Sequence, residues 1–215
     1  MKTISKETLL HQEIVNSISH GAGLLFGIIS IPYLIAIAII NISTTGVFAA
    51  YIYGFGFLMA FTFSTLYHSF KQPRKKYILT IFDHISIYFL IAGAYTPFTI
   101  IYVNNSFGMS LLAALWSLTL MGIFFKVFYT GRFENLSTAI YLLMGMLLLA
   151  GGKTFFAAMP VNVVELIIAG GVLYTTGVLF YVWKKYTYHH GVWHLFVLAA
   201  AIYHYVAVLK TIGYQ

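Results

Sequence analysis

Cysteine is absent from this chain of 215 residues, and charged residues make up only 8% of it. The absence of cysteine excludes a disulfide framework and any metal site built from thiolates. Soluble domains are about one quarter charged, whereas 60% of this chain is hydrophobic. The composition therefore excludes a soluble enzyme, a nucleic-acid-binding protein and a disordered chain. It predicts a protein that crosses the membrane several times.

Long windows without Asp, Glu, Lys or Arg predict the spans. Five such windows occur, at residues 14–70, 84–125, 135–152, 166–183 and 186–209. Each of the first two is long enough for two helices that cross about 30 Å of hydrocarbon, and the other three for one helix each. Their continuous apolar character disfavours a β-barrel. We therefore predict one all-α integral membrane domain, residues 1–215. Its seven transmembrane helices are expected near residues 17–40, 46–69, 78–101, 107–128, 136–157, 163–184 and 188–210.

The positive charges predict the orientation of these helices. If the N-terminus is cytoplasmic, the segments on that side contain Lys2, Lys6, Lys71, Arg74, Lys75, Lys76, Arg132, Lys184 and Lys185. Lys126 can snorkel to the same side, and only Lys153 and Lys210 remain on the opposite side. Cytoplasmic segments are enriched in Lys and Arg, so we expect the N-terminus inside and the C-terminus outside. The first twenty residues contain charges and no compact apolar run, so no cleavable signal peptide is expected.

Three histidines lie at the cytoplasmic ends of predicted helices. His190 and His194 are four residues apart, which places both imidazoles on one helix face. His68, at the end of the second predicted helix, falls at the same depth. Three protein ligands that leave a fourth position open are typical of catalytic zinc. The alternative is that these histidines only contact lipid headgroups or a backbone carbonyl, because a His-x-x-x-His pair alone is a weak signal.

Two further polar residues fall in the same layer. Asp83, near the start of the third predicted helix, can accept a proton from a metal-bound water. Ser64 lies one turn from His68 and can hydrogen-bond that water or Asp83. Ser64 can equally be a helix-packing residue, because small hydroxyl residues are common where membrane helices meet.

The remaining histidines are weaker candidates. His204 lies ten residues beyond His194, about 15 Å along a helix, and cannot share the site. His84 and His189 point away from the predicted ligands around their helices. His20 belongs to a polar stripe with Glu13, Asn16 and Ser17, which we interpret as a contact that holds the first helix. Direct contact of His20 with the site stays open as an alternative.

These motifs together resemble the hemolysin III family. They are Ser64-x-x-x-His68, Phe82-Asp83-His84-Ile85-Ser86, His190-x-x-x-His194 and the opening Glu13-Ile14-Val15-Asn16-Ser17-Ile18-Ser19-His20-Gly21. This family is the bacterial branch of the progestin and adiponectin Q receptors, within a superfamily that also contains alkaline ceramidases. The resemblance implies a location in the bacterial plasma membrane and a zinc ion held by His68, His190 and His194. It places Asp83 on the metal-bound water and Ser64 beside it. His20 and Ser86 are further candidates for contacts just outside the ligands.

Four functional hypotheses follow. The first is a zinc-dependent hydrolase of a lipid amide or ester, because relatives of known activity cleave ceramides in a cavity that opens to the bilayer. The second is a sensor or regulator of membrane state without turnover, and bacterial members have been linked to membrane-lipid homeostasis. The third is a pore-forming cytolysin, as the family label suggests. The fourth, a transporter, is disfavoured because the ionisable cluster lies near one face of the membrane.

Overall fold

The computed structural model describes residues 5–41, 43–183 and 185–213, and within these ranges the regular secondary structure is entirely helical. The helices are α1 (Lys6–Ile40), α2 (Thr44–Ser69), α3 (Pro73–Tyr102), α4 (Ser106–Tyr129), α5 (Glu134–Ala150), α6 (Gly152–Ala157), α7 (Val161–Val182) and α8 (His189–Gly213). All except α5 and α6 are long and apolar enough to cross a membrane. The described part of the chain therefore contains six candidate spans.

Side chains and turn residues determine several helix ends. Ser5, Ser43 and Asn105 each accept a hydrogen bond from the backbone three residues later, at 3.0–3.1 Å, and so begin α1, α2 and α4. Pro73 occupies the first turn of α3, where its missing N–H has no cost. α1 ends at Ile40 and α2 begins at Thr44, while α3 ends at Tyr102 and α4 begins at Ser106, which confirms the breaks expected between these predicted helices.

Two helices differ from the lengths expected. α1 begins at Lys6 instead of near residue 17, because a cap and a polar first turn extend it. Its 35 residues reach about 50 Å, well beyond the hydrocarbon thickness. The expected helix at 136–157 is interrupted at Gly151 and continues as α6. Gly152 has a φ of +53°, a left-handed conformation that breaks the helical path.

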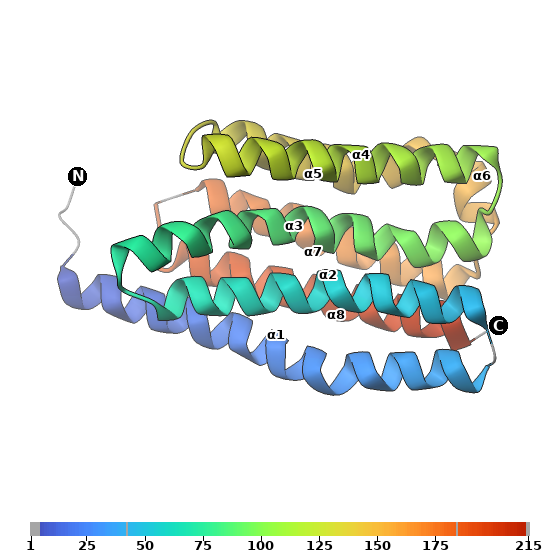
Figure 1. Cartoon of the computed structure of the whole chain (residues 1–215), viewed down its shortest axis with the longest axis horizontal. Helices are drawn as coiled ribbons and strands as arrows, with labels where there is room; N and C mark the ends of the chain where they lie inside the picture. Colours follow the sequence, from blue (N-terminus) through green and yellow to red (C-terminus); the bar gives the residue numbers. More distant parts are fainter. Residues whose placement is uncertain (1–4, 42, 184, 214–215) are drawn as a thin grey trace.

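The helices pack mainly in sequential pairs. α2 packs against α1 and α3, α3 also contacts α4, and α7 pairs with α8. α8 also contacts α1, α2 and α3 and so lies centrally in the bundle. In Figure 1, the start of α1, the α2–α3 turn, the α4–α5 turn, the end of α7 and the start of α8 lie at the same end of the molecule. We call this the basic end, since it contains Lys71, Arg74, Lys75, Lys76, Arg132 and Lys185.

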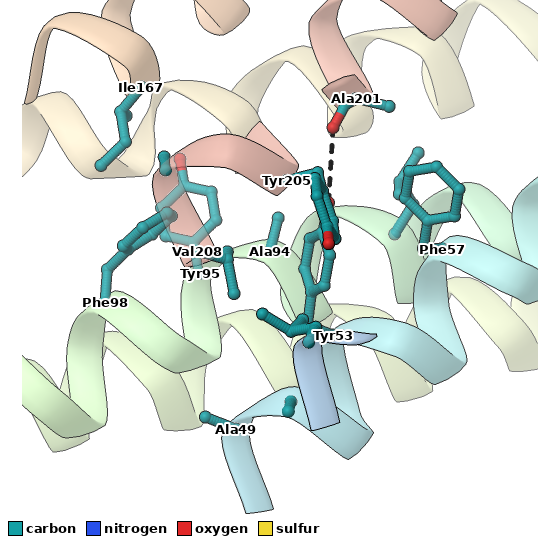
Figure 2. Packing of buried hydrophobic residues seen from close by; sticks show 14 of the residues in the cluster. Ala49, Tyr53, Phe57, Ala94, Tyr95, Phe98, Ile167, Ala201, Tyr205 and Val208 are labelled. Carbon is teal, nitrogen blue, oxygen red and sulfur yellow. Dashed lines mark hydrogen bonds between the residues drawn. The ribbon is translucent and has the colours of Figure 1, made fainter. Parts of the chain in front are cut away.

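The packed core is rich in aromatic residues, as Figure 2 shows for the region between α2, α3 and α8. The hydroxyl of Tyr53 donates to the carbonyl of Ala201 at 3.4 Å, and that of Tyr205 donates to the carbonyl of Ser30 at 2.9 Å. These bonds satisfy the polar ends of buried tyrosines. Large apolar side chains such as Ile29 and Val161 are about three-quarters exposed, at 75% and 73%. An apolar exterior around a packed interior suits a lipid environment.

Candidate metal centre

His68, His190 and His194 come together where α2 meets α8 at the basic end of the bundle. His68 lies in the last turn of α2, and the other two lie one turn apart at the start of α8. One ring nitrogen from each lies within 4.8 Å of the others. The ring centroids are 5.2 Å apart for His68 and His190, 5.0 Å for His68 and His194, and 4.6 Å for His190 and His194. The three imidazoles thus form a compact nitrogen cluster.

Hydrogen bonds orient two of these rings. Nδ1 of His68 lies 2.6 Å from Oε2 of Glu13, and Nδ1 of His194 lies 3.2 Å from the carbonyl oxygen of Asn16. Both acceptors favour a proton on Nδ1, which leaves Nε2 with a free lone pair. Nε2 of His68 and Nε2 of His194 are buried and make no hydrogen bond.

This arrangement fits a bound metal ion. Imidazoles that bind a metal usually donate their second ring N–H to a carboxylate or carbonyl, as His68 and His194 do here. Buried polar nitrogens without any partner are costly, and a cation among the three rings satisfies them. Nitrogen donors of this kind suit zinc, copper, iron or nickel. The donor set leaves room for at least one further ligand on a four-coordinate ion.

Asp83 and Ser64 lie beside the histidine cluster. Both line the same cavity, and the carboxylate of Asp83 interacts with the side chains of Ser64 and His68. Ser86 is almost completely buried, and its hydroxyl donates to the backbone carbonyl of Asp83 at 2.6 Å. Ser86 therefore binds within its own helix turn, where it supports the backbone that carries Asp83.

The polar stripe of α1 lies directly against the cluster. The ring of His20 packs 3.7 Å, centroid to centroid, from that of His194, and both of its nitrogens are buried without a hydrogen-bond partner. The hydroxyl of Ser19 also lies 3.3 Å from Nδ1 of His194. Sequence reasoning treated this stripe chiefly as a helix contact and did not assign Glu13 and Asn16 to the ligand histidines. Their helical spacing with His20 was the available signal.

His84, His189 and His204 do not belong to the three-histidine group. His189 is paired with the carbonyl of Phe180, and His204 with that of Ile167. His84 lies 3.7 Å from Glu134, which also accepts a 2.8 Å hydrogen bond from Lys126. Lys126 is fully buried in this ion pair. The expectation that it snorkels outward is therefore wrong, because its side chain is enclosed by the protein and its ammonium pairs with Glu134.

A cavity of about 830 Å³ opens from the histidine cluster into the bundle. Its wall includes His20, His68 and His190 at the polar end. Farther along, α3, α5, α7 and α8 line it with apolar side chains that include Leu90, Ala94, Leu142, Met146, Ile167 and Val197. Pockets of this size hold small-molecule ligands. The cavity thus combines a polar head region with a long apolar region.

Fold and site together define a class: a multi-pass helical membrane protein with a buried histidine cluster that can hold a metal ion. A family model described as "Haemolysin-III related" matches residues 8–205. The chain is 41% identical over 202 residues to Hemolysin-3 of Bacillus cereus, covering 92% of this chain and 90% of that protein. This chain belongs to the haemolysin III family.

Two further relatives show how widely the similarity extends. The chain is 40% identical over 200 residues to the Hemolysin-3 homolog of Bacillus subtilis, covering 93% of this chain and 94% of the relative. It is 27% identical over 167 residues to the human Monocyte to macrophage differentiation factor, covering 75% of this chain and 69% of the relative. The near-complete matches to bacterial relatives are consistent with a location in the cell membrane.

Proposed function

We propose that this protein is a zinc-dependent hydrolase that cleaves an amide or ester bond of a membrane lipid. One observation carries the proposal: the unpartnered Nε2 of His68 lies, with His190, at the polar end of an apolar-lined cavity, and the unpartnered Nε2 of His194 belongs to the same cluster. The polar end of the cavity suits a metal ion, and its apolar walls suit the acyl chain of a lipid. The role in membrane-lipid homeostasis follows from such a substrate.

His68, His190 and His194 would hold the zinc ion. A zinc ion held there would supply Lewis-acid chemistry that polarises the scissile carbonyl and lowers the pKa of a water molecule. Asp83 then takes a proton from the attacking water and delivers it to the leaving nitrogen or oxygen as the carbonyl bond to that atom breaks. Ser64 holds the Asp83 carboxylate in position through their side-chain interaction. The apolar walls orient the acyl chain and exclude bulk water from the reacting carbonyl.

The proposal includes seven membrane crossings with a cytoplasmic N-terminus. α5 is 17 residues long, about 25 Å, and falls short of the hydrocarbon thickness by itself. α5 and α6 together cover residues 134–157 and provide the seventh crossing despite the interruption at Gly151. The concentration of Lys and Arg at the basic end supports a cytoplasmic position for that end. Lys2 and Lys184, which contributed to the same argument, lie outside the described residues.

The decisive experiment measures metal content and hydrolysis on the same detergent-purified preparations. We expect about one zinc per wild-type chain by mass spectrometry and a large loss in His68→Ala. Asp83→Asn should retain zinc but lose about 10²- to 10⁴-fold in hydrolysis of whichever lipid amide or ester the wild type cleaves, since only the base is removed. Wild-type turnover by Asp83→Asn, or a folded wild type that binds no metal, would contradict the mechanism.

A sensor without turnover is the second candidate. It is favoured by the location of the ligands, because a metal shared by α2 and α8 fastens two helices that also contact α1. In that case His68→Ala should lower the melting temperature of the purified protein sharply, and no lipid should be hydrolysed. A hydrolase instead predicts a folded but inactive His68→Ala variant. Lysis through a pore, which the relatives' names suggest, requires single-channel conductance from the purified protein in a lipid bilayer.

A further inference from the structure

Glu13 joins three helices at the basic end through one carboxylate. Its Oε2 lies 2.6 Å from Nδ1 of His68 on α2, and its Oε1 accepts a hydrogen bond from Nζ of Lys76 on α3. Only 4% of the His68 side chain is exposed, against 35% for Glu13. A carboxylate on α1 therefore extends from a partly exposed position to a buried imidazole.

We propose that Glu13 is a positioning residue for the metal centre. The inference rests on the proposed metal-binding function. It assigns to a residue outside the ligand set the role of orienting a ligand imidazole. A carboxylate that accepts the Nδ1–H of a ligand histidine fixes its tautomer and ring orientation and makes Nε2 more basic. α1 acts on His194 in the same way, through the backbone carbonyl of Asn16. α1 thus orients two of the three candidate ligands.

A purely structural role makes a different prediction. If Glu13 served only to fasten α1 to α3, its contact with Lys76 would be the important one. Those two side chains are 35% and 26% exposed, and partly exposed ion pairs contribute only about 0–1 kcal/mol. Removal of Lys76 leaves the Glu13 carboxylate free to bond His68 alone. Loss of Lys76 should therefore spare metal binding, whereas loss of Glu13 should not.

The test is zinc affinity, measured on the full-length protein in detergent by competition with a chromophoric chelator. The variants are Glu13→Ala, Glu13→Gln and Lys76→Met, with Glu7→Gln as a control that removes an exposed acid from the first turn of the same helix. Glu13→Ala should weaken zinc binding about 10- to 100-fold. Glu13→Gln should weaken zinc binding less than Glu13→Ala does, because the amide oxygen of Gln still accepts a hydrogen bond from Nδ1–H of His68. Lys76→Met and Glu7→Gln should bind zinc as the wild type does.

Melting temperatures of the metal-free proteins complete the experiment. A positioning role requires that Glu13→Gln and Lys76→Met melt at similar temperatures without zinc and differ in zinc affinity. The inference is overturned if Glu13→Ala binds zinc as tightly as the wild type, or if Lys76→Met weakens binding as much as Glu13→Ala does. In either case zinc binding by the wild type leaves the proposed function standing. A wild type that binds no zinc overturns both.

Discussion

Imidazole nitrogens distinguish the candidate ligands from the other histidines only when several rings are considered together. His204 donates from Nε2 to the carbonyl of Ile167, and its Nδ1 is buried without a partner. Taken alone, this pattern matches that of His68. His204, however, does not belong to the group of imidazoles that can share one ion within the described residues. Convergence of three rings, more than the unpartnered state of any one nitrogen, is what defines the metal site.

Lys126 and Glu134 form an ion pair that should affect the stability of the bundle. Lys126 is fully buried, whereas the Glu134 side chain is 35% exposed. A buried ion left without its partner costs about 3–5 kcal/mol, while a partly exposed ion can reach water. Glu134→Gln should therefore lower the melting temperature of the purified protein clearly more than Lys126→Met does. The double variant should be closer to wild type than Glu134→Gln is, since it removes the stranded cation.

Thermal unfolding in detergent, followed by circular dichroism, measures the melting temperatures of Glu134→Gln, Lys126→Met and the double variant. His84 must be considered in the comparison because it lies 3.7 Å from the same Glu134 oxygen that binds Lys126. A His84→Gln background removes that second neighbour of the carboxylate. The prediction fails if Lys126→Met is the more damaging substitution in both backgrounds, because the buried cation would then be stabilised by something other than Glu134.

At the scale of the helix, charge-free windows were sufficient to predict the positions of the long apolar elements. They could not predict that α1 starts at Lys6, because that extension lies outside the apolar run and depends on a capping hydroxyl from Ser5. Nor could they predict the interruption at Gly151, because a window of apolar residues is equally compatible with one continuous helix and with two shorter helices. Backbone conformation at Gly152 decides between them. Composition thus identifies the spans, and local chemistry sets their ends.

Close contact between α1 and α2 depends on glycine. A Cβ atom placed on Gly23 would lie 2.2 Å from the ring of Phe61, which is completely buried. Gly23→Ala should therefore destabilise the protein by about 1–3 kcal/mol through overpacking. Gly21→Ala, two residues away, meets only a Thr65 methyl at 3.8 Å and gains helix propensity of about 1 kcal/mol.

The melting temperatures of these two alanine variants provide a matched test. Both substitutions add one methyl group to the same helix, so lipid and detergent effects are shared. We expect Gly23→Ala to melt below wild type and Gly21→Ala to melt at or above it. Equal melting temperatures for the two variants would mean that α1 and α2 can separate without cost, contrary to the close packing of Gly23 on Phe61.

At the scale of the whole molecule, the candidate site depends on which helix ends meet. The sequence placed His68, His190, His194 and Asp83 in one layer because counting charges assigns each helix end to a face of the membrane. It could not identify the hydrogen-bond partners of the rings, since nothing local to His68 indicates that Glu13, 55 residues earlier, lies 2.6 Å away. The gathering of these residues at one end of the bundle is therefore predictable from composition, whereas the environment of each ligand requires the packed bundle.

The absence of cysteine makes the proposed seven-span topology directly testable. Single cysteines at Gln72, Asn104, Arg132 and Lys153 introduce unique thiols at exposed positions near successive helix ends. With a membrane-impermeant maleimide on intact cells, we expect labelling of Asn104→Cys and Lys153→Cys only. Gln72→Cys and Arg132→Cys should react after the membrane is permeabilised, because the basic end faces the cytoplasm.

The pair Arg132→Cys and Lys153→Cys tests whether α5 and α6 together complete a crossing. Arg132 precedes α5 and Lys153 lies in α6, so the two thiols occupy opposite sides of the membrane only if the interrupted segment spans it. Labelling of both on the same side would reduce the count to six and place the C-terminus in the cytoplasm with the N-terminus. An inverted pattern at all four positions would instead move the histidine cluster to the outer face, where a hydrolase would act on lipids of the outer leaflet.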